Sequence, residues 1–199
     1  MSLTDLRARL LGGAIFSVGI AAITASPAQA SCNVAANAVT CGTTTTTNTS
    51  NAGGSPASNR AYQANTTAGD FNGIITAGST VSGYGLAFSD VIGAGNTLDI
   101  VNNGTIRVDS GNSPFAGGEA ALNILTYGLT DIHYSGAGAI TNLGGGFSTD
   151  GLFMESLGTG NVVADIGGDV TAVGLATRGV TAFQDGPNSG SIGITRSTR

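Results

Sequence analysis

The chain has 199 residues, of which 33 are glycine and only 10% are charged. Its formal net charge is −5, and its basic residues are arginines that lie apart along the sequence, with no lysine. Nucleic acid binding requires a cluster of Lys and Arg that displaces counterions from phosphate, so this composition argues against a nucleic acid partner. Plentiful Val, Ile and Thr favour strands, and plentiful Gly and Asn favour tight turns.

Residues 1–30 have the organisation of a secretory signal peptide. Two arginines give a positive start, an apolar run follows at residues 10–25, and Ala-Gln-Ala at residues 28–30 suits a cleavage site for small residues. The apolar run is short for a membrane span of about 20 residues. We therefore predict cleavage between Ala30 and Ser31, and an exported mature chain.

Two cysteines, Cys32 and Cys41, follow directly after this site and are the only ones in the chain. An even number of cysteines in an exported chain is typical of a disulfide. A metal site would need further Cys or His ligands, and His133 is the only histidine. We therefore predict a Cys32–Cys41 disulfide and no metal or other cofactor.

Residues 31–69 contain the disulfide loop and then a stretch of low complexity rich in Thr, Asn, Ser and Gly. This composition predicts either a weakly structured leader or a poorly packed first turn ahead of the main fold. From about residue 70 onward, short apolar stretches alternate with turn residues. We therefore divide the chain into a signal peptide (1–30), a leader (31–69) and a repetitive region (70–199).

Apolar and polar residues alternate along several segments of the repetitive region. Ile106 and Val108 form one such segment, and Val162, Ala164 and Ile166 form another. A period of two is typical of a strand with one buried face. We expect these five side chains to point into the core. The pattern recurs near the end of the chain, at residues 192 and 194.

Short motifs also recur in this region. Tyr-Gly-Leu at residues 84–86 recurs at 127–129, and Gly-Ala-Gly at residues 93–95 recurs at 136–138, so both motifs have the same offset. Looser copies begin near residues 151 and 179. If the shared offset spans two units, the mean unit length lies in the low twenties.

Units of this kind predict an all-β chain that forms a parallel β-helix, or β-solenoid, over residues 70–199. Each turn of a solenoid buries its apolar side chains against the next turn. A compact β-sandwich also has short strands and regular turns, but it does not require motifs to recur at matching offsets. We therefore favour the solenoid.

No motif in the sequence assembles a catalytic site. His133 is not accompanied by a nucleophile motif such as Gly-x-Ser-x-Gly, and we expect it on the surface of a turn. Arg107 and Arg178 are likewise expected on solvated faces. We expect no catalytic residues and no enzyme activity. The alternative is a carbohydrate-active β-helix enzyme acting on extracellular polysaccharide, in which acidic side chains would converge in a groove.

The signal peptide, the Cys-x8-Cys loop, the threonine run and glycine-rich units such as residues 102–106 and 160–170 resemble the N-terminal part of a bacterial autotransporter passenger, a protein of type V secretion. The resemblance implies a β-helix that crosses the periplasm and is carried through the outer membrane by a barrel. These residues contain no such barrel, so we expect a passenger fragment whose partner is a separate outer-membrane barrel.

The role implied by this resemblance is non-enzymatic. We expect adhesion to, or interaction with, an unidentified extracellular ligand. The expected destination is the cell surface, the outer membrane or the extracellular medium.

Overall fold

The computed structural model describes residues 32–35, 37–47, 62–65, 69–111, 120–145, 149–186 and 190–197. The predicted cleavage site at Ala30 and Ser31 lies outside these residues. The described residues form strands and turns without a helix, and the strands build one sheet of seven strands and two sheets of five. The prediction of an all-β parallel solenoid is confirmed.

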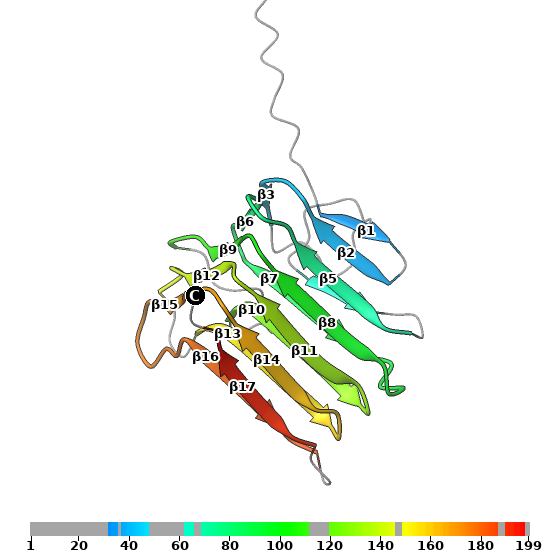
Figure 1. The fold of residues 1–199 in the computed structure, drawn as a ribbon. Helices are drawn as coiled ribbons and strands as arrows, with labels where there is room; N and C mark the ends of the chain where they lie inside the picture. Colours follow the sequence, from blue (N-terminus) through cyan, green and yellow to red (C-terminus); the bar gives the residue numbers. More distant parts are fainter. Residues whose placement is uncertain are drawn as a thin grey trace, which may run out of the picture.

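The seven-stranded sheet, here sheet 1, runs diagonally across Figure 1 from β1 to β17. Its strands are β1 (Asn33–Ala35), β2 (Ala38–Cys41), β5 (Phe71–Ile75), β8 (Thr97–Asn102), β11 (Asp131–Gly136), β14 (Val162–Ile166) and β17 (Ile192–Arg196).

The two five-stranded sheets complete each turn. Sheet 2 contains β3 (Thr45–Thr46), β6 (Thr80–Ser82), β9 (Thr105–Val108), β12 (Ala139–Asn142) and β15 (Val170–Ala172). Sheet 3 contains β4 (Tyr62–Asn65), β7 (Leu86–Asp90), β10 (Ala120–Gly128), β13 (Asp150–Gly158) and β16 (Val180–Gln184).

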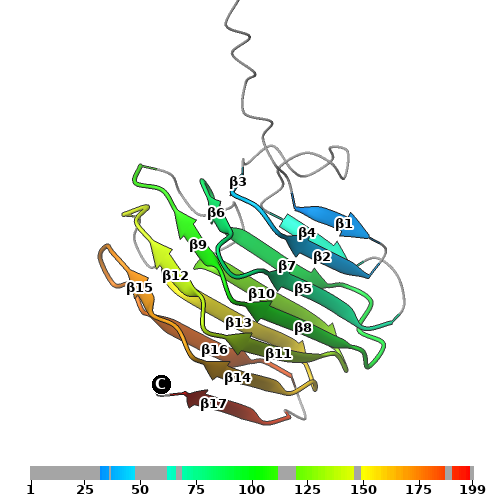
Figure 2. The ribbon, with the colours of Figure 1, turned by 45° about the horizontal axis from the view of Figure 1, so that its top comes forward.

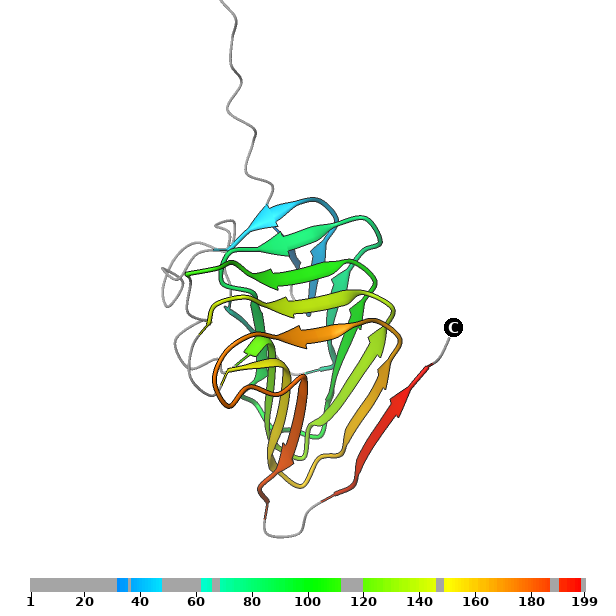
Figure 3. The same ribbon diagram turned by 90° about the vertical axis from the view of Figure 1, so that its left-hand side faces the viewer.

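The chain passes from sheet 1 to sheet 2 and then sheet 3, and returns to sheet 1 one strand further along. Figures 2 and 3 show the resulting stack of turns, with the blue N-terminal strands at one end and the red strand β17 at the other. All pairs between these strands are parallel except β1–β2, which is antiparallel.

The strand register gives the true repeat length. Ile132 pairs with Val162, and Val162 pairs with Ile192. Both steps have the sequence separation of 30 that also joins Asp131 to Asn161 by a hydrogen bond. The preceding step, from Leu98 to Ile132, is slightly longer. The predicted unit in the low twenties is therefore wrong, because each turn contains three strands and three corners.

The recurring motifs gave a wrong repeat length because their copies occupy different places in the turn. Tyr-Gly-Leu at residues 84–86 leads into β7, whereas the copy at residues 127–129 ends β10. Gly-Ala-Gly at residues 93–95 lies between sheets 3 and 1, whereas the copy at residues 136–138 lies between sheets 1 and 2. The motifs mark tight corners in general and not one position of a repeat.

The inward side chains form continuous columns across the turns. Ile106, Val108 and Val162 are fully buried, and Ala164 and Ile166 are at most 6% exposed, so the predicted inward face is confirmed. The core also contains large side chains from all three sheets: Phe71, Phe88, Leu98, Leu122, Ile124, Ile132, Tyr134, Ile140, Leu152 and Met154. One turn alone could not bury them, so the stability of each turn depends on its neighbours.

The solenoid begins earlier than predicted. Strand β2 pairs in parallel with β5, and Cys41 is fully buried in the common core. The predicted disulfide joins Cys41 to Cys32. The disulfide loop is therefore part of the first turn, and the boundary at residue 70 does not separate it from the described sheets.

The last strand differs from the others. Ile192 and Ile194 of β17 pair with the buried residues Val162 and Ala164 of β14, which places them in the inward columns. They are nevertheless 46% and 47% exposed. Burial in a solenoid requires a turn on each side, and β17 has a described partner on one side only.

Glycines stack on one another at two corners. A Cβ atom on Gly158 would overlap the carbonyl oxygen of Gly128, and one on Gly186 would overlap that of Gly158. Between sheets 1 and 2, Gly168 stacks on Gly138 in the same way. These close approaches between backbones explain part of the high glycine content, because a side chain at these positions would force neighbouring turns apart.

Replacing Ile106 with Asp should destabilise the fold by several kcal/mol, because the substitution buries a carboxylate with no partner in an apolar column. Arg107→Ala is the matched control, since the neighbouring Arg107 side chain is exposed and forms a surface ion pair with Asp109. Thermal unfolding followed by circular dichroism tests this. Equal melting temperatures for the two variants would contradict the inward register.

Gly158→Ala should destabilise the chain by about 1–3 kcal/mol, because the added methyl group meets the Gly128 carbonyl. Gly193→Ala is its control, since a Cβ atom at Gly193 has no neighbour within 4 Å. Urea unfolding of both variants gives the comparison. If Gly158→Ala were as stable as Gly193→Ala, the glycines would not be in backbone contact.

Candidate functional site

Carboxylate and amide side chains along the corner between sheets 3 and 1 accept hydrogen bonds from the backbone of the next turn. Asp131 Oδ1 accepts from the backbone N–H of Asn161 at 2.6 Å, one turn later. Asn161 Oδ1 in turn accepts from the N–H of Ser191 at 2.9 Å. Asp70 accepts in the same way from the N–H of Thr97 at 2.8 Å. These side chains connect neighbouring turns at a corner where the strand ladder is interrupted.

Two further aspartates are almost completely buried, and both have partners. Asp90 accepts from the N–H of Ile92 at 2.8 Å and from the hydroxyl of Thr130 at 2.9 Å. Asp150 accepts from the N–H of Arg178 at 3.0 Å and from the hydroxyl of Thr181. The Arg178 guanidinium lies 3.6 Å from Asp150 and is half exposed. Both carboxylates therefore stabilise loops between strands.

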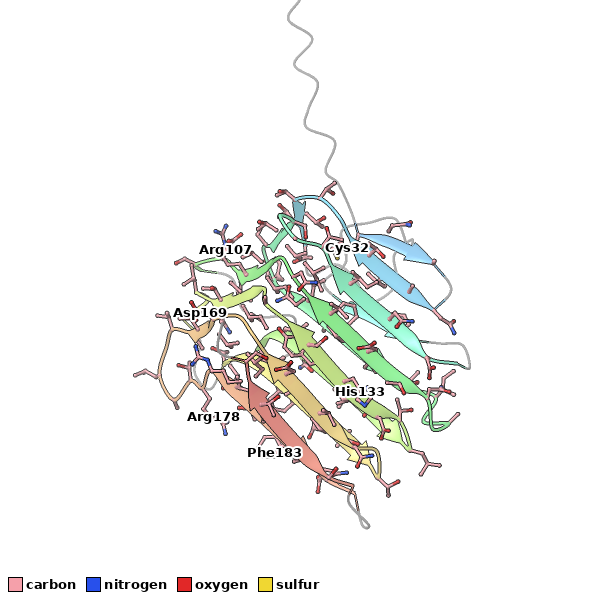
Figure 4. The ribbon with its side chains drawn as sticks, in the orientation of Figure 1. Cys32, Arg107, His133, Asp169, Arg178 and Phe183 are labelled. Atoms are coloured by element: carbon pink, nitrogen blue, oxygen red, sulfur yellow. A yellow bond between two sulfur atoms is a disulfide. The ribbon has the colours of Figure 1, made fainter. Side chains whose placement is uncertain are left out.

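His133 and the two arginines lie on the surface, as predicted. His133 is exposed on the outer face of β11, where its register neighbours are Asp99 and Val163. Figure 4 shows His133 well separated from Arg107 and Arg178. The structure therefore does not bring the three residues together.

Acidic side chains do not converge in either of two surface hollows. A hollow of about 360 Å³ at the C-terminal end contains one carboxylate, Asp169, which lies 3.5 Å from the Arg196 guanidinium. A hollow of about 200 Å³ between sheets 1 and 2 also contains one, Asp165. A glycosidase requires a pair of carboxyl groups across the bond that it cleaves. Neither hollow provides that pair.

Among the described residues, no group of three or more His, Cys, Asp or Glu side chains could hold a metal ion. The same part of the chain contains no helix with the length and hydropathy of a membrane span.

A strip of exposed apolar side chains crosses three successive turns between sheets 3 and 1. Tyr127 and Leu157 are register partners on β10 and β13. Asp90 of β7 pairs with Thr126 of β10, so the next residues along the two segments, Val91 and Tyr127, lie side by side. Leu129 donates its backbone N–H to the carbonyl of Gly93 at 3.1 Å, and Gly93 directly follows Ile92. Ile92 and Leu129 therefore extend this apolar strip, whose five members are 37–61% exposed. Contiguous exposed apolar surface is typical of an interaction site.

Sequence reasoning did not find this strip, because its members lie about one turn apart in the chain. The sequence signal that could have indicated the strip is the position of apolar residues beside corner glycines. Val91 and Ile92 stand directly before a corner glycine, and Tyr127 and Leu129 flank another. These corners lie side by side only because β7 pairs with β10 and β10 pairs with β13. Strands of the other two sheets separate each of these pairs in the sequence, so local patterns do not reveal the pairing.

Tyr134 is the one tyrosine in the core of the described residues. Its side chain is 2% exposed, and its hydroxyl receives a long hydrogen bond of 3.5 Å from the Asn102 amide. Burial raises the pKa of the Tyr134 hydroxyl, and the Asn102 hydrogen bond opposes this shift. Asn102 also accepts from the N–H of Gly104 at 3.2 Å, so the pair belongs to a structural corner.

No protein-family model, curated protein or solved structure matches this chain. Fold and surface together define its class. The chain is a parallel β-solenoid with a disulfide in its first turn and a strip of exposed apolar side chains along the corner between sheets 3 and 1.

Burial of Tyr134 predicts a loss of stability at alkaline pH. The folded-state pKa is raised above the unfolded value of about 10, so the stabilisation is complete below that pH and is lost as the pH rises above it. Tyr134→Phe should show a smaller decline over the same pH range. Urea unfolding at a series of pH values tests this. A decline of equal steepness in both proteins would contradict the assignment.

Proposed function

We propose that this chain is a non-enzymatic, exported surface passenger of the autotransporter type, which presents the apolar strip to an extracellular partner. The strip is the observation that carries the proposal. Its five side chains are 37–61% exposed along one corner of the solenoid, and exposed apolar surface of this kind is typical of an interaction site. The signal peptide pattern and the resemblance to passengers support the secretion route.

The acidic residues support the non-enzymatic part of the proposal. Asp70, Asp131 and Asp150 each accept hydrogen bonds from the backbone, and Asp90 is similarly engaged. A hydrolytic enzyme needs carboxyl groups that are free to exchange protons with substrate. Carboxylates that hold loops in place are unsuited to this task, so the observations favour an interaction role over the carbohydrate-active alternative.

The role of the strip can be tested on cells that display the chain through a fused outer-membrane barrel. The variant Leu129→Asp/Leu157→Asp should reduce cell–cell clumping and attachment to polystyrene several-fold, because it places two charges in the strip. The control is Val163→Asp, which places a charge at a similarly exposed position on the outer face of sheet 1. Surface immunostaining should confirm equal display. Unchanged adhesion in the double variant would contradict the proposed role.

The secretion route makes a separate prediction about processing. The exported chain should begin at Ser31, because the Ala-Gln-Ala sequence suits the signal peptidase pocket. Without a barrel, residues 1–199 should be protected from external protease on intact cells, and fusion to a barrel should expose them. N-terminal sequencing and protease digestion measure both. An N-terminus at Met1, or efficient surface exposure without a barrel, would argue against this route.

A further inference from the structure

The inward face of sheet 3 becomes polar where its strands end. Along β10, Leu122 and Ile124 point into the core, and the next inward position is Thr126. Asp90 on β7 and Ser156 on β13 are the register partners of Thr126. These three residues, here the polar column, are at most 1% exposed. Figure 2 shows their three strands side by side.

Two members of the polar column have hydroxyl groups without a partner. The side-chain oxygens of Thr126 and Ser156 are buried, and neither has a hydrogen-bond partner among the described residues. Strand β10 lies between β7 and β13, and β13 lies between β10 and β16, so both hydroxyls lie inside the sheet and away from its edges. Burial of a hydroxyl without a hydrogen bond is unfavourable, and the large majority of buried polar groups in native proteins have a partner.

The sheet 1 side of the same corner adds further polar groups. Asn96, Thr130 and Gly160 occupy equivalent positions in three successive turns, two residues before a fully buried residue of sheet 1. Alternation along the strand turns these positions inward. The Nδ2 atom of Asn96 is buried and, like the two hydroxyls, has no hydrogen-bond partner in the described part of the chain. Polar groups of both sheets therefore face the inside of this corner.

Asp90 adds a carboxylate to this polar interior. It accepts from the Ile92 N–H and the Thr130 hydroxyl, which are both uncharged. A carboxylate has about four lone-pair sites, so Asp90 can accept further hydrogen bonds. The corner thus contains hydrogen-bond donors as well as acceptors. Water satisfies both kinds of group, whereas a metal ion is bound by oxygen ligands and is repelled by an N–H donor such as that of Asn96.

The spacing between the two hydroxyls suits one bridging water molecule. Equivalent atoms on neighbouring strands lie about 4.8 Å apart, which is too long for an O–H···O hydrogen bond of about 2.7 Å. A water molecule that makes two hydrogen bonds of about 2.8 Å at a tetrahedral angle joins oxygens about 4.6 Å apart. The preceding inward positions of the same strands carry the larger side chains Phe88, Ile124 and Met154, so the short polar side chains leave room.

The polarity of this corner is inverted relative to the inward columns of Ile, Val and Leu. Each member of the polar column directly precedes a member of the apolar strip along the chain. Because side chains alternate between the two faces, the polar residue points inward and its apolar neighbour points outward. The buried polar groups of this corner therefore need partners that the apolar core cannot supply.

We propose that the inner corner between sheets 3 and 1 binds structural water, with one molecule bridging the hydroxyls of Thr126 and Ser156 and others hydrogen-bonded to Asn96 and Asp90. The bridging molecule accepts from one hydroxyl and donates to the other, so that both buried groups are satisfied. It links two successive turns at a place where their side chains alone do not meet. This inference does not depend on the proposed adhesive role, because it concerns the interior of the solenoid.

A high-resolution crystal structure of the purified exported chain tests the site directly. Electron density should show a water oxygen within about 3.2 Å of both hydroxyls. A direct hydrogen bond between Thr126 and Ser156, or hydroxyls that donate to backbone carbonyls with no water between them, would overturn the proposal. A metal ion, recognised by oxygen ligands at about 2.4 Å, would overturn it as well.

The sign of a stability change provides a second test. Thr126→Val replaces the hydroxyl with a methyl group of similar size. If water bridges the two hydroxyls, this change removes one partner of the water and should lower the urea midpoint by about 0.5 M. In a dry corner, the same change removes an unsatisfied polar group and should raise the midpoint instead. A midpoint equal to or above that of the parent chain would contradict bound water.

The matched control is Thr141→Val, since Thr141 lies on the outer face of β12 and is only partly buried. It makes the same chemical change where solvent reaches the hydroxyl, so the midpoint should shift less. A shift as large as that of Thr126→Val would mean that the loss is not specific to the corner, against the proposal.

A double variant tests whether the two hydroxyls share one molecule. Thr126→Val/Ser156→Ala removes both partners of the bridging water, so it should lower the midpoint by less than the sum of the two single changes. Its crystal structure should lack the bridging density. Additive losses from the two changes would show that the hydroxyls act independently, and would count against a shared water.

Discussion

The close stacking of one turn on the next is the constraint on which this fold depends. Neighbouring strands in a sheet lie about 4.8 Å apart, and the corners must approach as closely as the strands do. At two corners the chain meets this requirement with glycine, because the space that a Cβ atom of Gly158 or Gly168 would need is occupied by a carbonyl oxygen of the preceding turn. The inward columns of Ile, Val and Leu form only because the corners permit this spacing.

The same constraint explains how exposure varies along the solenoid. Central residues such as Ile132 and Val162 have a turn on each side and are fully buried, whereas Ile194 occupies an equivalent inward position at the edge and is half exposed. Stability in such an array is a sum of contacts between neighbouring turns, so the end turns are its weakest part. At the N-terminal end, β1 and the Cys32–Cys41 disulfide provide the cover that a further turn would otherwise supply.

Much of the fold could be predicted from the sequence, because alternation and composition are local properties. The inward positions at Ile106, Val108 and Val162 follow from a period of two, and the disulfide follows from the two cysteines of a chain whose sequence predicts export. Turn length could not be deduced from Gly-Ala-Gly, because corners of different types share the same need for glycine. The partners of Asp150 and the apolar strip depend on the register between successive turns, whose paired strands lie far apart in the chain. Local sequence patterns do not contain that register.

In this solenoid, equivalent strands of successive turns lie side by side and parallel, as the register of sheet 1 shows. Nuclear Overhauser effects between backbone protons would measure that register directly in the oxidised chain. We predict cross-peaks between the Ile132 strand and both Leu98 and Val162, in the pattern of parallel pairing. Antiparallel cross-peaks between strands consecutive in the chain, such as β8 with β9, would contradict the solenoid and the functional account built on it.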